Sequence, residues 1–492
     1  MAPVVGEEIG IYLVYHDQGR CRSSLAVAAS FWPTGLSIQE KTIVGEQIER
    51  LVRFVTETSW DNIPETVRRH AKLVLLDTLG VILAGSEQPE VQQLRNRLIA
   101  QGGQGATVLA RGCPTTDPRT AALLNGTAGR SIELCEGHRY VSCQGAVQVV
   151  PVMLATGEWS NRSGREALTT LILAYDVAVR IGSCLTPRTL AHQNGQAPLI
   201  GAIAAGARLR GLNVDETSRA LRIGATLVLT PSYTNAVAGA TVLNVAGGMS
   251  GFAGSLAPDL ALAGFEAQDN AIEEAFTSLV GDGFQPDKMV EELGTRWEIA
   301  RNYFRLRACC NPIYAALEAL EDALAELHPA PDQIERIDVA TYRFASVMRN
   351  PEPKNYFGAK YSLPHAAAAV AIRGNAGYGS FTEAMVHDPA ITALRRRVHI
   401  TEDPKFTAAA PHLKPARVTV ILKDGRQTTR TCESPRGDFQ RPYRESEVRE
   451  KFRELAGRVL TREGVNAVER AVDQCDRLNS IRELIERLQH YA

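Results

Sequence analysis

The chain has 492 residues, which is more than one hydrophobic core usually supports, so two domains are expected. Lys plus Arg number 54 and Asp plus Glu number 55, and this balance gives no electrostatic reason to expect nucleic acid or a membrane surface as a partner. Only 6% of the residues are aromatic while 40 are glycine, which favours closely packed helices over a sheet of aromatic and β-branched strands.

Cysteine usage and hydropathy favour a cytoplasmic protein. The nine cysteines have no regular spacing and form no CxxC pair, which is typical of reduced thiols. No apolar run approaches the ~20 residues needed to cross a bilayer. The N-terminus begins with acidic residues and has only a short apolar segment broken by serine, so it does not resemble a signal peptide. We expect residues 1–40 to be an extension of the folded protein.

The first long region, residues 41–302, has the periodicity of helices. Apolar residues recur at helical spacing between residues 43 and 59, and a second helix is expected from Pro64, near its start, to Gly85, near its end. Four further apolar segments are rich in Gly and Ala on more than one face, which indicates buried helices at short interaxial distances. These segments are residues 121–132, 149–159, 167–185 and 197–212.

The pattern changes after about residue 300. Residues 334–345 and 415–434 alternate with a period of two, and Asp424-Gly425 is a strong hairpin signal. Helical runs lie between them, so residues 303–433 are predicted to form an α+β lid domain. Residues 434–492 return to charged amphipathic helices, which we expect to pack back on the all-α domain. The predicted fold class is therefore mainly α, with an inserted α+β domain.

A polar segment, SIELCEGHRYVSCQGAV at residues 131–147, lies between two apolar helices. Cys135, His138 and Cys143 with Glu133 or Glu136 are of the types that bind zinc, but their spacing matches no standard zinc site. A polar loop at the end of a helix is a second interpretation. Acid–base or substrate-binding chemistry is a third, and the residues alone leave all three open.

Three other polar segments carry candidate side chains. His192 lies in LAHQNGQAP, which is either a capped turn or a break between buried helices where a cleft forms. Arg305 and Arg307 in FRLRACCNP are either solvated or bidentate donors to carboxylates. The segment AKYSLPH at residues 359–365 contains Lys360, Tyr361 and His365, and its Tyr and His are possible proton donors.

Several segments together resemble the MmgE/PrpD family, which includes 2-methylcitrate dehydratase, cis-aconitate decarboxylase and iminodisuccinate epimerase. The matching segments are LVLLDTLGVILAG (73–85), AALLNGTAGRSIEL (121–134), HQNGQAPLIGAIAAGARLRGL (192–212), RWEIARNYFRLRACCNP (296–312), AKYSLPHAAAAVAI (359–372), PARVTVILKDGR (415–426) and PRGD (435–438). The resemblance covers roughly residues 43–480. It implies a large all-α domain built from both chain ends, a smaller inserted α+β domain, a homodimer, and an active site in the interdomain cleft without a metal.

The resemblance also assigns positions, residue by residue. Glu133 matches the first acid of the family's LDFDDTH-like loop, and His192 matches the histidine of its HPTG-like segment. Elsewhere this chain departs from the family pattern. Gln144, or Cys143 with a one-residue shift, stands at a family histidine, Thr241 and Arg305 stand at lysines, Asn244 and Cys310 stand at histidines, and His365 stands at a tyrosine.

The resulting hypothesis is a lyase, a dehydratase or decarboxylase, that acts on a small carboxylic acid without a cofactor or metal. His192 is the predicted base, and His138 or His365 the predicted acid; Glu133 and Cys143 complete the catalytic candidates. The predicted substrate-binding residues are Gln144, Asn244, Arg305, Arg307 and Lys360. The alternatives are an epimerase that pairs His192 with His138 or Cys143, and a family member recruited as a cyclising enzyme or binding protein.

Overall fold

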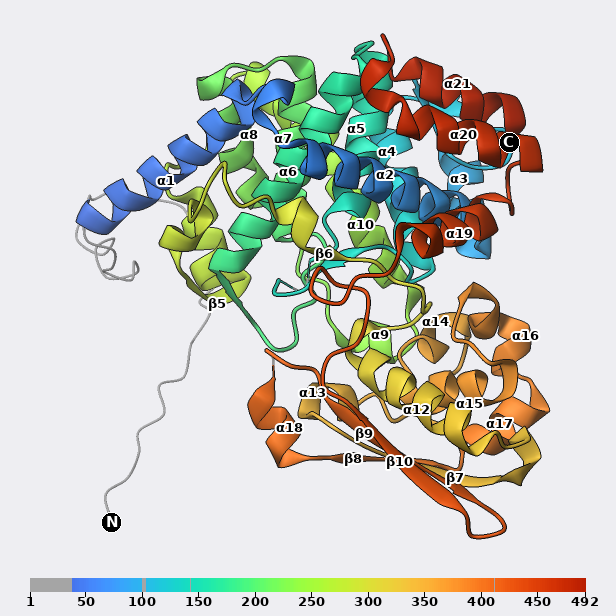
Figure 1. Cartoon of the computed structure of the whole chain (residues 1–492). Coiled ribbons are helices and arrows are strands. Elements are labelled where there is room, and N and C mark those ends of the chain that lie inside the picture. Colours follow the sequence, from blue (N-terminus) through green and yellow to red (C-terminus); the bar gives the residue numbers. More distant parts are fainter. Residues whose placement is uncertain (1–37, 100–102, 142, 411) are drawn as a thin grey trace, which may run out of the picture. The chain divides into compact units, whose positions relative to one another are not determined.

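The computed structural model describes residues 38–99, 103–141, 143–410 and 412–492. Residues 43–492 form one compact unit, and the extension predicted for residues 1–40 lies almost entirely outside the described part of the chain (Figure 1). The described chain is mainly helical, as predicted.

Buried apolar side chains form two clusters within that unit. One is drawn mostly from residues 48–304 and 448–488, and the other mostly from residues 308–432. The domain boundaries at residues 303 and 433 stay predictions, because both clusters lie in the same compact unit.

The first cluster is a set of packed helices. They are α1 (Ile38–Glu57), α2 (Glu65–Gly85), α3 (Pro89–Ile99), α4 (Pro118–Ser131), α5 (Ala146–Trp159), α6 (Gly164–Cys184), α7 (Ala197–Arg210), α8 (Val214–Leu227) and α10 (Val245–Leu262). Local sequence fixes several of their starts. The Asp117 side chain accepts the first free N–H groups of α4, and Ser163 and Glu166 form a capping box on α6. Helix α6 is as long and apolar as a membrane-spanning helix, but 89% of its most apolar window is buried inside the protein.

Glycines allow α7 and α10 to approach each other closely. A Cβ atom added at Gly206 would lie 2.0 Å from the carbonyl oxygen of Gly254, a backbone atom that cannot move aside locally. The variant Gly206→Ala is therefore expected to lower the free energy of unfolding by about 1–3 kcal/mol, measured by urea denaturation. Gly45→Ala in α1 is the control: within the described residues, no atom outside the local helix backbone lies within 4 Å of an added Cβ, so it is expected to stabilise by up to about 1 kcal/mol. Equal effects at both sites would contradict this account.

The second cluster surrounds a four-stranded sheet of order β10-β9-β7-β8. Its strands are β7 (Ile334–Thr341), β8 (Val398–Glu402), β9 (Ala416–Leu422) and β10 (Gln427–Cys432). Strands β9 and β10 form the predicted hairpin, with Gly425 at φ +88° in its turn. Strand β7 ends at Thr341, earlier than the alternation suggested, because α13 (Arg343–Ser346) begins there. Helix α12 (Tyr314–Leu327) packs on β9 and β10, beside α15 (Leu363–Arg373) (Figure 1).

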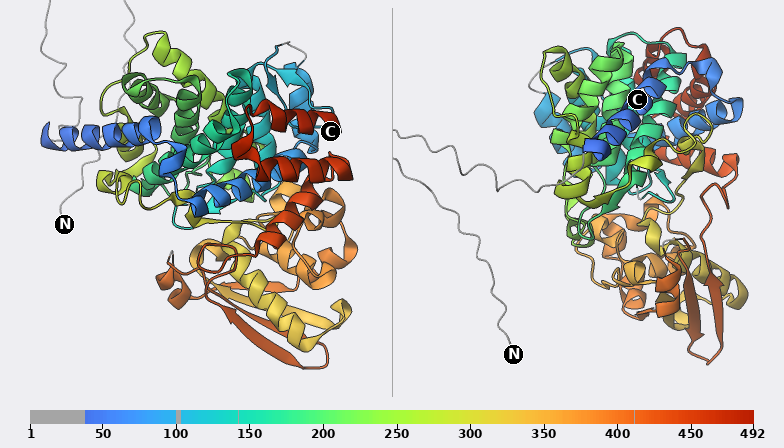
Figure 2. Two further views of the ribbon diagram at one scale, coloured as in Figure 1. Left: turned by 45° about the horizontal axis from the view of Figure 1, so that its top comes forward. Right: turned by 90° about the vertical axis from the view of Figure 1, so that its left-hand side faces the viewer.

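The C-terminal residues form three helices, α19 (Glu445–Ala456), α20 (Arg462–Asp473) and α21 (Arg482–Tyr491). Helix α19 packs on α2, and Figure 2 shows these red helices beside the blue ones in both views. The Lys451 ammonium group lies 2.6 Å from a carboxylate oxygen of the buried Asp77 in α2 and donates to the Leu134 carbonyl at 2.6 Å. This contact ties the end of the chain to the segment 131–147 that carries the predicted site.

Candidate active site

The site is organised around Glu133, directly after α4. Its backbone has φ +53°, which is rare for a non-glycine residue and is common where structure holds a functional side chain in place. The buried carboxylate receives Arg130 Nη2 at 2.5 Å and Arg305 Nη1 at 2.5 Å, one arginine on each oxygen. The Tyr361 hydroxyl donates to it at 2.7 Å. Residues from two distant segments therefore join Arg130 on one carboxylate.

Electrostatics keep Glu133 ionised. Burial alone would raise the pKa of its carboxyl group, but Arg130 and Arg305 outweigh burial and hold that pKa well below its usual range. The carboxylate in turn raises the pKa of the Arg130 guanidinium group, although burial opposes this. The charges of Arg130, Arg305 and Glu133 sum to +1, buried from water.

His192 lies beside this carboxylate as a neutral ring. It stacks on Tyr233 with the ring centroids 5.4 Å apart, and its Nδ1 atom accepts the backbone N–H of Asn194 at 3.2 Å. Burial and repulsion from Arg130 lower its pKa to about 3. Because Nδ1 is an acceptor, the neutral ring carries its proton on Nε2. We call Arg130, Glu133, His192, Arg305 and Tyr361 the Glu133 cluster.

Amide side chains join Gln144 to this cluster. With the Asn194 amide oriented to satisfy its neighbours, its oxygen accepts from Arg130 Nε at 2.7 Å and its nitrogen donates to Gln144 Oε1 at 2.6 Å. Gln148 lies behind them: its Oε1 accepts the Gly195 N–H at 3.0 Å and the Ser250 hydroxyl at 2.7 Å. The segment after His192 is therefore held by a hydrogen bond to Gln148 of α5, which Ser250 of α10 fixes in turn.

Two buried amides near this site have unused hydrogen-bonding capacity. Within the described residues, both polar atoms of the Asn244 side chain, and both of Gln196, lack a hydrogen-bond partner. Asn244 directly precedes α10, whose Gly247 lies against the Arg130 side chain. Buried amides are normally paired, so unpaired ones beside a charged site are suited to bind a polar ligand.

The other two candidate histidines are engaged outside the cluster. His138 lies in β3 (Gly137–His138), which pairs with β6 (Asn302–Tyr303), and its Nε2 is 3.1 Å from Glu298. His365 Nε2 is 3.0 Å from the Ser380 carbonyl oxygen, and burial lowers the pKa of its ring to about 4. In the described structure, no hydrogen bond joins either ring to the Glu133 cluster.

Cys143 is also buried apart from Glu133, and burial raises the pKa of its thiol. A nearby carboxyl group, Glu136, accepts the Tyr175 hydroxyl at 2.7 Å and the Ala146 N–H at 2.9 Å. Among the described residues, no three His, Cys, Asp or Glu side chains are grouped as a metal site requires.

The two remaining predicted cations, Arg307 and Lys360, differ in whether another side chain already neutralises their charge. Arg307 binds Glu321 at 2.6 Å and the Tyr443 hydroxyl at 3.2 Å. Lys360 is buried beside aromatic rings and donates weakly to the Ala308 carbonyl at 3.4 Å. Burial lowers the pKa of Lys360 to about 8, although Glu133 opposes the shift.

Sequence reasoning missed Arg130, Asn194 and Tyr233. A signal was present for Arg130, which stands three residues before Glu133 at a spacing that suits an ion pair in a helix. Asn194 is two residues from His192, whereas Tyr233 is brought to that ring by the packing of a separate segment.

Fold and site together define a mainly helical protein with a buried carboxylate–arginine–histidine site. The chain belongs to the MmgE/PrpD family: the model of the family's N-terminal domain matches residues 49–287, and that of its C-terminal domain matches residues 308–477.

Curated relatives align over most of this chain. The cis-aconitate decarboxylase-like protein oryM of Aspergillus oryzae is 25% identical over 483 residues, which covers 92% of this chain and 98% of that protein. A cis-aconitate decarboxylase of Aspergillus terreus is 24% identical, covering 89% of this chain and 95% of its own length. The Mus musculus cis-aconitate decarboxylase is 23% identical, with 85% and 88% coverage.

Proposed function

We propose that this protein is a lyase of the decarboxylase type that acts on a small acid with one or two carboxylates, and that the Glu133 cluster is its reaction site. Family membership and the relatives named cis-aconitate decarboxylase support the coarser assignment, a lyase of the dehydratase or decarboxylase type. The finer assignment rests on the state of His192, a neutral ring close to two arginines.

The state of His192 favours decarboxylation over dehydration. Dehydration requires a base that removes a proton from carbon, and a base with a pKa of about 3 is poorly matched to that task near neutral pH. Epimerisation requires two opposed proton-transfer groups, whereas His138 and His365 are bound to Glu298 and Ser380. Decarboxylation requires no base, because the C–C bond to the departing CO2 supplies the electron pair.

The count of cations favours a substrate with few carboxylates. Arg130 and Arg305 share Glu133, so together they leave a single positive charge. Arg307 is neutralised by Glu321. Lys360 adds a second charge below a pH of about 8. A citrate-type acid with three carboxylates would leave at least one of them without a counter-charge in a buried site.

The proposed reaction assigns a role to each group. Arg130 and Arg305 bind a carboxylate that does not react, and the amides of Gln144 and Asn244 orient the substrate. As CO2 leaves, the electron pair passes to a neighbouring double bond or carbonyl group of the substrate. His192 donates a hydrogen bond from Nε2 to the charge that develops there. Lys360, with a pKa near neutrality, supplies the proton that replaces CO2.

A substrate screen tests this proposal. The purified protein would be incubated with mono-, di- and tricarboxylic acids that carry a double bond or carbonyl group next to the reacting carbon, and products would be identified by mass spectrometry. We expect loss of CO2 from a mono- or dicarboxylic acid, and a large reduction in the Lys360→Met variant. Loss of water instead of CO2, or a preference for tricarboxylic acids, would contradict the proposal.

A further inference from the structure

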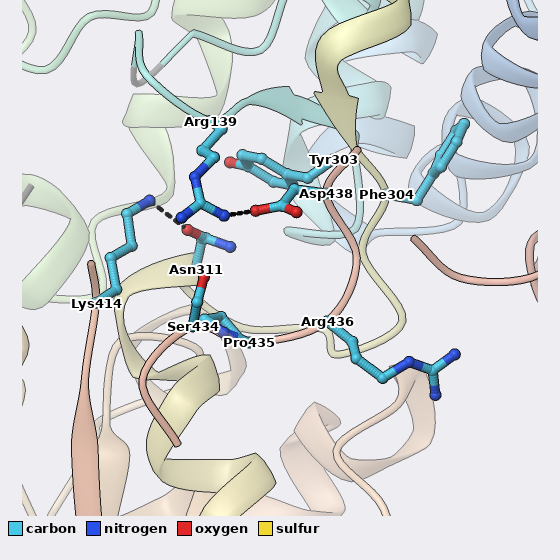
Figure 3. Close-up of a pocket in the computed structure, with 9 residues that line it drawn as sticks. All are labelled: Arg139, Tyr303, Phe304, Asn311, Lys414, Ser434, Pro435, Arg436 and Asp438. Atoms are coloured by element: carbon cyan, nitrogen blue, oxygen red, sulfur yellow. Dashed lines mark hydrogen bonds and ion pairs between the residues drawn. The ribbon is translucent and has the colours of Figure 1, made fainter. Parts of the chain in front are cut away.

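A pocket lies beside Tyr303, a residue that also contacts the Glu133 cluster. Its cavity volume is about 20 Å³, and residues from β6, the segment after it and residues 434–438 line it (Figure 3). The Tyr303 ring forms part of its wall, while the Tyr303 hydroxyl accepts a hydrogen bond from Arg305 at 3.1 Å. Tyr303 therefore contacts both the pocket and the Glu133 cluster.

Two of the three cations that line the pocket are neutralised. Arg139 forms an ion pair with Asp438 and donates to the His412 carbonyl at 3.1 Å. The Asp438 carboxylate also accepts two backbone N–H groups, so it is fully engaged. Arg436 binds Glu447 at 3.0 Å, and Figure 3 shows its guanidinium group turned away from the other side chains.

The third cation, Lys414, has no such counter-charge. Its ammonium group donates to Asn311 Oδ1 at 2.9 Å, and within the described residues no carboxylate lies within ion-pair distance of it. Burial, with repulsion from Arg139 and Arg305, lowers the pKa of Lys414 to about 8. A cation held next to other cations attracts an anion from solution.

We propose that this pocket binds one small oxyanion, a carboxylate or a phosphate group, between the Lys414 ammonium group and the Asn311 amide. Figure 3 shows the Lys414, Asn311 and Arg139 side chains directed toward one another, with the Asn311 amide nitrogen on the pocket side. Hydrogen-bond donors therefore outnumber free acceptors in this pocket, because the Asp438 carboxylate is already paired with Arg139. One net positive charge and a small volume fit a single anionic group. No residue of the Glu133 cluster lines this pocket, and the proposal does not depend on the reaction proposed for that cluster.

Isothermal titration calorimetry at constant ionic strength, with chloride as the background anion, tests the proposal with acetate and inorganic phosphate as probes. We expect saturable binding of at least one probe, and the stronger one identifies the ligand chemistry. Lys414→Met is expected to weaken that binding about tenfold or more, because a charged hydrogen bond is lost. Arg436→Gln is the matched control: it removes a pocket-lining cation that points away, and it is expected to change the affinity less than about twofold.

Two further variants distinguish binding in this pocket from a loss of folding and from binding in the Glu133 cluster. Asn311→Asp places a carboxylate beside Lys414 and is expected to abolish binding while the protein stays folded, as judged by circular dichroism. His192→Ala is expected to leave the affinity unchanged, because it alters only the Glu133 cluster. The proposal is overturned if neither probe binds saturably, if Lys414→Met binds like the unmodified protein, or if His192→Ala removes binding while Lys414→Met does not.

Discussion

The variant Glu133→Gln is expected to lose about 3–5 kcal/mol of unfolding free energy, the usual cost of removing one partner of a buried ion pair. The substitution keeps the size of the side chain but leaves Arg130 and Arg305 buried without a counter-charge. Urea denaturation followed by circular dichroism near neutral pH measures the effect. Glu57→Gln is the control, since Glu57 pairs with Arg53 on the surface at 3.2 Å, where an ion pair contributes only about 0–1 kcal/mol.

The stability difference between this variant and the unmodified protein is expected to depend on pH. The pKa of Glu133 is held well below its usual range in the folded protein, whereas an unfolded glutamate has a pKa of about 4.3. The stabilisation is therefore complete above about pH 5, and it is lost as the pH falls toward the folded-state pKa. The difference in stability between the two proteins should stay constant from about pH 5 to pH 8 and shrink below about pH 4. A difference that persists undiminished in acid would show that the charge of Glu133 is not its source.

Much of the secondary structure could be predicted because it is encoded locally. The period-two segments became β7, β9 and β10, and Asp424-Gly425 formed the turn between β9 and β10. Alternation and a glycine at positive φ depend only on neighbouring residues. The Gly- and Ala-rich segments became α4 to α7, because the periodicity of a helix is also a local pattern. The end of β7 at Thr341 was harder to place, because the alternation of the sequence continues into α13.

The site could be predicted only in part, because its contacts are tertiary. Glu133 and Gln144 share the segment 131–147, but His192 and Arg305 come from distant segments, and it was the resemblance to a family, rather than any spacing, that placed them together. The spacing of Arg130 and Glu133 suits an ion pair, but the sequence does not show that Arg130, in the last turn of a helix, is buried. The homodimer and the cytoplasmic location stay predictions.

The three candidate histidines also could not be distinguished from the sequence. The sequence gives His138, His192 and His365 the same chemistry, and only the fold distinguishes them. A carboxylate engages the first ring, a backbone N–H the second, and a carbonyl oxygen the third. None of these partners lies near its histidine in the sequence except Asn194. A side chain's titration behaviour depends on such partners, so it could not be read from the residue type.

His192→Ala is expected to lower kcat/KM on the true substrate by about 10²–10³-fold, because it removes a hydrogen bond to the charge that develops as CO2 leaves. His192→Gln should retain more activity than His192→Ala, since its amide N–H is also a donor. Cys143→Ser is the control and should keep nearly full activity, because its thiol has no hydrogen bond to the described Glu133 cluster. Steady-state kinetics of the three variants, with stability checked separately, measure these effects.

The pH dependence of kcat/KM distinguishes a hydrogen-bond donor from a general base at His192. With a pKa of about 3, the His192 ring stays neutral across the working range, so kcat/KM should show no inflection near the usual histidine pKa of about 6.5. If His192 were instead a general base with an ordinary pKa, activity would rise through that region and both substitutions would abolish it equally. Equal loss in His192→Gln and His192→Ala, together with such an inflection in the unmodified protein, would replace the decarboxylase mechanism with one that begins by removing a proton from carbon.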